Sequence, residues 1–528
     1  MSELTATAAL VRFILRRDRV RIVVWIAAIG ALILSTVASI KGLYSTQVAL
    51  DRAAAAAEDN AAIIALNGPP YGLRTLGGRV VFESGSFGLV VVALMSTLMV
   101  GRHTRAEEES GRVELVRAAV VGRYAPAAAT LLVVVAMNLV VGAVVALGML
   151  GQGLPTGGSL VFGASFTALG LVFTAVAAVA AQVTENTRVV YGASGALLGL
   201  AYALRAVGDS TGGTLSWFSP IGWVQASRAY AGDRLWPLAI ALAVALALVA
   251  VARALAARRD LGAGLVAPQP GPPVASRRLL SPVGLAFRLQ RGTLVGWSAG
   301  LFLGGASYGS LGDAVEELIR DNPALADVFA TAGGPSITDS FFGSAMLLMA
   351  LIGAGYAVQS SQRLRGEEAS QLVEPLLATA VSRVAWAASH LVLALAGSVV
   401  VLAATGLGAG IAFAIVSADA SQVPRLVGAA LVHTPAVWVL VGVTVALFGL
   451  APRAVLAAWA VYALCLVVGM LAEVLDLPGW LTALSPFDHT PQLPAADFTL
   501  APLAILIAIA AGLVALGLAA FRRRDLAY

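Results

Sequence analysis

Residues 105–123 read RAEEESGRVELVRAAVVGR, and residues 365–383 read RGEEASQLVEPLLATAVSR. Nine of the nineteen aligned positions are identical at a constant offset of 260, and most of the identical side chains are charged. Apolar stretches resemble one another by chance in a hydrophobic chain, but charges matched at fixed spacing do not. The two stretches therefore indicate an internal duplication, which divides the rest of the chain.

Weaker matches extend this repeat in the same order along both halves. They are Arg16, Arg19 and Trp25 with Arg288, Arg291 and Trp297, Ser219-Pro220 with Ser485-Pro486, and Arg258-Arg259-Asp260-Leu261 with Arg523-Arg524-Asp525-Leu526. Residues 262–283 between the halves are rich in proline and glycine, as extended linkers are. The sequence therefore predicts a first half at 1–261, a cytoplasmic linker at 262–283 and a second half at 284–528.

The composition excludes a soluble globular protein. Hydrophobic residues make up 59% of the 528 positions and charged residues only 12%, about half of the usual charged share. Apolar runs of about 20 residues, enough to cross a bilayer as helices, recur along the chain. They lie at about 22–40, 85–101, 124–150, 159–182, 189–207, 236–256, 293–311, 341–359, 384–414, 426–450, 453–473 and 499–520. We predict an all-α integral membrane protein with twelve transmembrane helices, arranged as two parallel six-helix repeats.

The charges predict the orientation of these helices. With both termini and the even-numbered loops in the cytoplasm, most of the Lys and Arg residues lie inside and most of the acids outside, as the positive-inside pattern requires. The net charge of +5 thus reports orientation, and no nucleic-acid partner is expected. Six crossings per half give a parallel repeat, which in transporters encloses a central pathway.

The duplicated charged stretch falls on the cytoplasmic side, between the second and third spans of each half. Helical spacing of its charges predicts one short amphipathic helix in the first copy. Pro375 predicts a break in the second copy, which gives two short helices with Glu374 near the start of the second. A loop that only fixes topology needs positive charge alone. Because both copies also keep acids at matched positions, we favour a docking surface for a cytoplasmic partner.

The pattern R-x-E-E-x-S, followed by Glu and by a small residue and Arg, resembles the coupling segment of ABC-2 type exporter permeases. Its duplicated form is similar to the fused permeases described as tetronasin, polyketide antibiotic or multidrug exporters. The resemblance covers nearly the whole chain. It implies a type V exporter-like fold in a bacterial plasma membrane, and two copies of a separate ABC ATPase subunit as partners.

Carried over by position, each charged stretch serves one ATPase subunit. The first set is Arg105, Glu107, Glu108, Glu114 and Arg123, and the second is Arg365, Glu367, Glu368, Glu374 and Arg383. The resemblance also implies interfacial connecting helices around Arg12–Arg21 and Arg288–Arg291, and re-entrant outer-gate helices around 208–235 and 474–497.

The chain lacks the residues of an ATPase or a metal enzyme. A phosphate-binding loop needs a lysine, and the sole lysine, Lys41, follows the first span. We therefore expect no catalytic residues and no cofactor bound by this chain, with ATP and Mg held by the partner ATPase. The four histidines lack ligand spacing, so no metal site is expected. Cys465, the single cysteine, lies in an apolar run.

Two other classes of membrane protein stay open. An ion-coupled secondary multidrug transporter can share the repeat architecture, but it usually needs ionisable residues deep in the bundle, and the predicted spans have almost none near their centres. A membrane enzyme would need clustered acids or histidines at one face.

In the exporter interpretation the cargo is a hydrophobic or amphiphilic compound that leaves the cell. The resemblance implies a conduit between the halves. Its expected lining is Phe87, Met95 and Met99 facing Phe341, Phe342, Met346 and Met349, because soft side chains adapt to varied apolar ligands.

Overall fold

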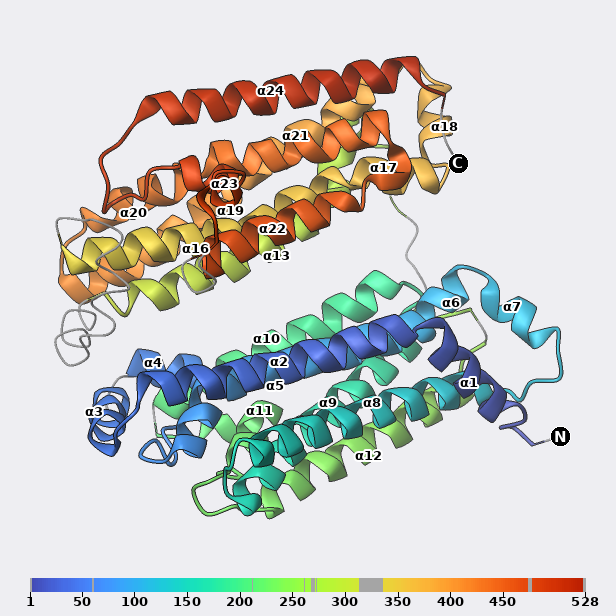
Figure 1. The fold of residues 1–528 in the computed structure, drawn as a ribbon. Coiled ribbons are helices and arrows are strands. Elements are labelled where there is room, and N and C mark those ends of the chain that lie inside the picture. Colours follow the sequence, from blue (N-terminus) through green and yellow to red (C-terminus); the bar gives the residue numbers. More distant parts are fainter. Residues whose placement is uncertain are drawn as a thin grey trace. The chain divides into compact units, whose positions relative to one another are not determined.

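The computed structural model describes residues 2–58, 61–210, 212–260, 262–266, 271, 273–312, 336–472 and 477–525. Every regular element within these ranges is a helix (Figure 1). The chain forms two compact units, unit 1 (Met1–Gly271) and unit 2 (Pro272–Tyr528). The boundary between them falls in the proline-rich stretch 262–283.

Unit 1 begins with a short helix and a long one, followed by two short helices on the way to the second long helix. Its elements are α1 (Thr7–Arg17), α2 (Arg19–Leu43), α3 (Gln47–Glu58), α4 (Ala61–Asn67), α5 (Leu76–His103), α6 (Arg105–Glu109), α7 (Arg112–Arg117), α8 (Ala125–Gly151), α9 (Thr156–Val183), α10 (Thr187–Ser210), η1 (Leu215–Phe218), α11 (Pro220–Gln225) and α12 (Trp236–Ala257).

Unit 2 shows a comparable series of long helices joined by short ones. Its elements are η2 (Arg277–Leu280), α13 (Pro282–Gly309), α16 (Ile337–Ser361), α17 (Arg363–Ala369), α18 (Val373–Leu377), α19 (Arg383–Ser417), α20 (Gln422–Leu431), α21 (Thr434–Leu450), η3 (Pro452–Ala454), α22 (Ala457–Leu471), α23 (Gly479–Thr482), η4 (Pro486–His489) and α24 (Leu500–Arg523).

Ten of the twelve predicted apolar runs each coincide with one long helix, whereas the run 426–450 is divided between α20 and α21, and the described part of the run 453–473 between η3 and α22. Ten helical segments of the described chain are long and apolar enough to cross a membrane, which confirms an all-α integral membrane protein. The count of twelve stays a prediction. Of the two remaining helices, α22 has only 15 residues, and α13 carries Arg288 and Arg291 among its 28.

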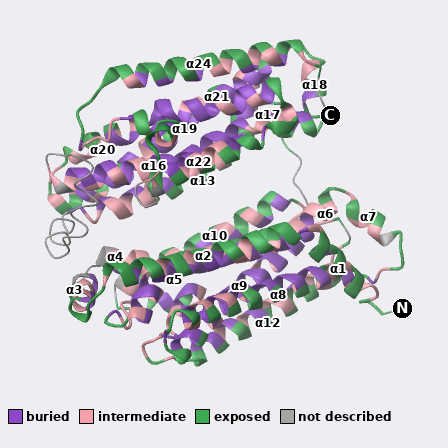
Figure 2. Cartoon of the chain, viewed as in Figure 1, coloured by how far each residue is buried: buried purple, intermediate pink, exposed green. Residues whose placement is uncertain are grey.

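Within each unit the spanning helices differ in how fully they are packed. In the most apolar stretches of α5 and α9, 72% of the residues are buried, against 22% in α2 and α12. In unit 2 the segments containing α16 and α21 again reach 72%, and α24 only 22%. Figure 2 shows this contrast along the helices. Helices buried all round form the centre of each unit, while the others leave an apolar face for lipid.

Glycines allow two helices of unit 2 to pack backbone to backbone. A Cβ added to Gly517 of α24 would overlap the carbonyl oxygen of Val445 in α21, and one added to Gly449 would overlap the carbonyl oxygen of Gly517. Gly512, on the same helix α24, has open space at its Cβ position. Small residues at such crossings are typical of helix pairs in membranes.

We predict opposite effects of alanine at these two positions of α24. Gly517→Ala should lower the free energy of unfolding by about 1–3 kcal/mol, because the backbones must separate. Gly512→Ala should raise it by up to about 1 kcal/mol, because alanine favours helix where nothing obstructs it. Thermal unfolding of the purified variants measures both. Equal shifts of the two variants would contradict the close packing of α21 on α24.

The basic helices that precede the first span differ between the units. In unit 1, α1 is separate from α2, with Asp18 between them. It turns Ile14 inward and leaves Phe13 exposed. In unit 2, residues 282–309 form one continuous helix, so the expected second connecting helix around Arg288–Arg291 is instead the first part of α13.

The two units also differ in the residue at one matched position of these helices. Asp18 is matched by Gln290 at the offset that pairs Arg19 with Arg291. Gln290 lies inside α13, where it contacts His390 Nδ1 at 3.1 Å and accepts a hydrogen bond from Ser360 at 2.6 Å. An amide inside the helix thus replaces the carboxylate at the junction of α1 and α2.

Candidate functional site

Both copies of the charged stretch fold as two short helices joined by a tight turn. In unit 2, α17 and α18 flank Gln371 and Glu374 lies in the first turn of α18, which confirms the predicted break. In unit 1 the prediction of a single helix is wrong, because the chain breaks there too, between α6 and α7. The cause is Gly111, whose φ of 69° takes the left-handed conformation that ends a helix.

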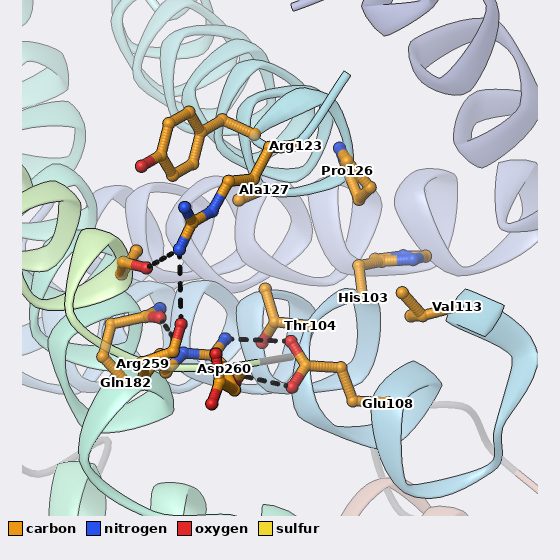
Figure 3. Close-up of a pocket in the computed structure, with 12 residues that line it drawn as sticks. His103, Thr104, Glu108, Val113, Arg123, Pro126, Ala127, Gln182, Arg259 and Asp260 are labelled. Carbon is orange, nitrogen blue, oxygen red and sulfur yellow. Dashed lines mark hydrogen bonds and ion pairs between the residues drawn. The ribbon is translucent and has the colours of Figure 1, made fainter. Parts of the chain in front are cut away.

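Arg105 lies in the interior of unit 1, and Glu108 beside it is partly buried. The Arg105 side chain is fully buried and donates to Glu108 Oε2 at 2.8 Å and to the Ala263 carbonyl at 3.0 Å. It also donates to the Ala181 carbonyl at the end of α9. Glu108 is bound a second time by Arg259, at 3.0 and 3.1 Å (Figure 3). The Glu108 carboxylate thus joins α6 to the end of α12, and the two arginines that bind it also bind the start of the linker.

Unit 2 contains the same arrangement. Glu368 is only 1% exposed and accepts from Arg524 at 2.7 and 2.9 Å and from Arg365 at 3.3 Å. Arg259 and Arg524 hold the same position of the repeated Arg-Arg-Asp-Leu sequence. Each unit therefore clamps one glutamate between an arginine of its own segment and an arginine after its last helix. We call Arg105, Glu108 and Arg259, and Arg365, Glu368 and Arg524, the anchor triads.

Arg123 and Arg383 make a second link at the same place. Arg123 Nη2 donates to the carbonyl oxygens of Ala256 and Arg259, both at 3.3 Å, and Arg383 Nη1 donates to that of Arg524 at 2.7 Å. Carbonyl groups at a helix C-terminus lack intrahelical partners and attract cations. In each unit the chain entering the third long helix is thereby fixed to the end of the last one.

Glu107 and Glu367 also have partners within their units, but different ones. Glu107 accepts from Arg17 of α1 at 2.7 Å. Glu367 is 4% exposed, accepts from Arg363 at 2.9 Å and lies 3.3 Å from His390 Nε2. The acids that the sequence assigns to an external partner therefore also hold each segment on its own unit.

Another set of side chains of the segments faces outward. Glu114 of α7 and Glu374 of α18 are exposed. Beside them, Leu115 is 77% exposed and Leu372 58% exposed. We call these four residues the exposed tips. Charge and apolar surface combined at the end of a helix pair suit a protein contact better than a purely hydrated loop does.

Asp18, which the sequence analysis did not single out, links α1 to the end of α5. It is 3% exposed and accepts from Arg102 at 2.9 and 3.2 Å and from Arg21 at 3.2 Å, with His103 Nε2 at 2.8 Å. Burial alone would raise the pKa of Asp18, but the hydrogen bond from Arg102 and the surrounding positive charges lower it below its ordinary value. The available signal was a lone acid among Arg16, Arg17 and Arg19.

Replacing Asp18 with asparagine should lower the free energy of unfolding by about 2 kcal/mol at pH 7, because Arg102 loses its charged partner. A carboxyl group whose pKa is lowered in the folded state stabilises above its ordinary pKa, near 4, and loses that effect as the pH falls through the folded value. The gap between wild type and variant should therefore close below about pH 4. Denaturant unfolding from pH 7 to 3 measures it, and a gap that is constant with pH would contradict an ionised Asp18.

A pocket of about 340 Å³ lies beside the anchor triad of unit 1 (Figure 3). Glu108, Arg123, Arg259 and Asp260 line it together with Pro126 and Val113. With so many charged groups in its walls, this space suits water and ions better than an apolar cargo.

The expected substrate-path residues are mostly packed inside their units. Met95 and Met99 belong to the core of unit 1, and Phe87 is 48% exposed. In unit 2, Phe342 and Met346 are fully buried, Phe341 packs against Phe342 with ring centroids 5.4 Å apart, and Met349 is 6% exposed. A conduit lined by the buried members would require α5 and α16 to repack, and the path stays a prediction.

Comparison with known proteins gives two matches. Residues 279–522 match the domain family described as Multidrug efflux system permease Rv1217c, C-terminal domain. The chain is also 43% identical to the Multidrug efflux system permease protein Rv1217c of Mycobacterium tuberculosis (strain ATCC 25618 / H37Rv), over 99% of this chain and 96% of that protein. The similarity thus extends through both units.

Proposed function

Because this chain belongs to the family of multidrug efflux system permeases, we propose that it is the membrane-spanning subunit of an ATP-driven exporter. In this proposal it moves hydrophobic or amphiphilic compounds out of the cell across the bacterial plasma membrane, with both termini in the cytoplasm. Two copies of an ABC ATPase subunit dock on it, one at each charged segment.

The observation that carries the proposal is the duplication of the anchor triads. The same three side chains fix both segments, so α6–α7 and α17–α18 are positioned alike although much of their other sequence differs. A loop that only sets the orientation of the chain in the membrane does not need to be held to its unit by ion pairs. A segment that transmits force from an ATPase needs such ion pairs, because a displacement of its exposed residues must reach the membrane helices.

The path for such a displacement is short. The apolar helical segment that contains α5 runs on to Glu109 and so includes α6, and the one that contains α16 runs on to Ala369 and includes α17. These segments are among the most buried of their units. The exposed tips follow these segments after short turns, so a partner that moves a tip can shift the central helix.

In this proposal the partner ATPase binds ATP and Mg. Lys41 Nζ donates to the carbonyl oxygen of Gln152 at 2.7 Å and to its side-chain oxygen at 3.1 Å, at the end of α8. A phosphate-binding loop would need this lysine, the only one in the chain, at the start of a helix after a glycine-rich turn.

The test is purification of the tagged chain from its native membrane in mild detergent. We expect an ATPase subunit to accompany it at two copies per chain, measured by native mass spectrometry. ATP should drive uptake of a hydrophobic dye into inverted vesicles that contain the complex, and a substitution of the partner's phosphate-binding lysine should stop it. Dye transport driven by a pH gradient in vesicles without any ATPase would overturn the proposal in favour of an ion-coupled carrier.

A further inference from the structure

A second polar pocket lies at the opposite end of unit 1 from α6 and α7. Helix α10 connects the two ends: the Thr187 backbone donates to Glu109 of α6 at 2.7 Å, and Asp209 in its last turn lines the second pocket. This pocket has a volume of about 350 Å³. The side chains in its wall that matter here are Tyr71, Asp209, Trp217, Arg228, Arg234 and Trp236.

The charged side chains of this pocket give it a net positive charge. Asp209 is compensated, since it lies 3.7 Å from the fully buried Arg205 and accepts from Ser216 at 2.5 Å. Arg228 and Arg234 have no acidic partner among the described residues. An anion is therefore the ligand that this pocket would attract.

Arg228 is held in a way that leaves its donors available. Its guanidinium lies over the Tyr71 ring, with the carbon 4.3 Å from the ring centroid. Stacking uses the face of the guanidinium, while its N–H groups point outward in the plane. Such a group can donate two parallel hydrogen bonds to the oxygens of a carboxylate or a phosphate.

An aromatic surface adjoins the two arginines. Trp217 and Trp236 stack with centroids 5.4 Å apart and ring planes 13° apart, and they are 44% and 53% exposed. The Trp223 Nε1 donates to the Trp217 carbonyl at 2.6 Å and helps to fix η1 beside the stack. Stacked exposed indoles next to a charged group are suited to a ligand with an apolar body and a polar head.

The loop that carries the arginines has a strained backbone that hydrogen bonds hold in place. Arg228, Tyr230 and Asp233 take φ values of 51°, 62° and 47°, each of which costs about 1–3 kcal/mol for a residue with a side chain. The Asp233 carboxylate accepts from the Tyr230 amide at 2.8 Å, and the Tyr230 hydroxyl hydrogen-bonds to Ser159 at 2.7 Å. Strained residues of this kind cluster at sites that bind ligands.

We propose that this pocket binds the head group of an anionic amphiphile. Arg228 and Arg234 contact its carboxylate or phosphate oxygens, and its apolar body lies against Trp217 and Trp236. The amphiphile is either an anionic lipid of the surrounding leaflet or an exported compound, and the chemistry of recognition is the same for both. At the offset of 266 that pairs Ser219 with Ser485, unit 2 has Pro494 and Leu500, so this pair of arginines is not repeated there.

The test uses the purified full-length chain in a neutral detergent, without any ATPase, so its outcome is separate from that of the exporter proposal. The probe is 11-(dansylamino)undecanoate, with its uncharged primary amide as the comparison, and binding is followed by energy transfer from tryptophan. Arg228→Gln with Arg234→Gln should weaken binding of the carboxylate by about tenfold or more and abolish its advantage over the amide. Arg253→Gln, at an exposed arginine of α12, is the matched control and should bind like wild type.

Equal affinity of the double variant and wild type for the carboxylate would overturn the site, as would equal affinity of the wild-type chain for the carboxylate and the amide. If the double variant does not fold, Trp236→Ala, at an exposed side chain, replaces it with the same expected loss. Nanodiscs then distinguish the source. Displacement of the probe by phosphatidylglycerol but not by phosphatidylcholine assigns the site to a lipid, and retention in both assigns it to an exported compound. Displacement by both lipids alike would overturn an anion site in the membrane.

Discussion

Glu368→Gln is expected to lower the free energy of unfolding by about 3 kcal/mol or more, the largest stability effect that we predict for a single substitution. The carboxylate is 1% exposed and binds Arg524 through both of its oxygens. Removing its charge leaves Arg524, whose side chain is 15% exposed, without its counter-charge. Breaking one member of a buried pair has a much larger effect than the net value of the pair itself.

The measurement is denaturant unfolding of the purified chain, arranged as a double-mutant cycle with Arg524→Gln. Since the two side chains act together, their effects should fall well short of additive. Glu114→Gln is the control, an exposed acid of the corresponding segment in unit 1, and should change the stability by less than about 0.5 kcal/mol. Additive effects, or a Glu368→Gln variant as stable as wild type, would contradict the anchor triad.

The anchor triads also show what the sequence could and could not reveal. Both partners of each ion pair lie in repeated stretches, Glu108 with Arg259 and Glu368 with Arg524. Two repeated charges of opposite sign in each half are a signal that they pair with one another. The prediction assigned the acids to an external partner because both copies keep them at matched positions. It did not include the contacts within each unit, because the members of each pair lie 151 and 156 residues apart and hydropathy says nothing about such contacts.

The long helices were predictable because they depend on local sequence and not on contacts between distant residues. A membrane-spanning helix satisfies its own backbone and is recognised from local apolar composition, so ten of the twelve predicted runs each coincide with one long helix. Local breaks depend on single conformations that composition does not encode. Gly111 ends α6 by taking a positive φ, and the carboxylate of Asp18 marks the junction of α1 and α2, whereas Gln290 continues α13. These differences required the structure.

Replacing the two leucines of the exposed tips with aspartate, Leu115→Asp together with Leu372→Asp, is expected to abolish coupled transport without unfolding the chain. These side chains are 77% and 58% exposed, so a carboxylate there stays hydrated. In a docked ATPase interface the same carboxylates would be buried without partners, which costs several kcal/mol per site and lowers affinity by at least about a hundredfold. Charge reversal at Glu107 and Glu367 would instead remove contacts to Arg17, Arg363 and His390 and destabilise the fold.

The readouts are ATP-driven dye uptake, substrate-stimulated ATP hydrolysis and co-purification of the ATPase, each beside the thermal unfolding of the chain. Val266→Asp with Val274→Asp is the matched control, because these linker side chains are 64% and 77% exposed and lie outside the segments. The control should transport like wild type, and the tip variant should keep its melting temperature while losing the ATPase. Full transport by the tip variant would place the ATPase contact elsewhere, since two exposed carboxylates cannot be tolerated at the centre of an interface that transmits force.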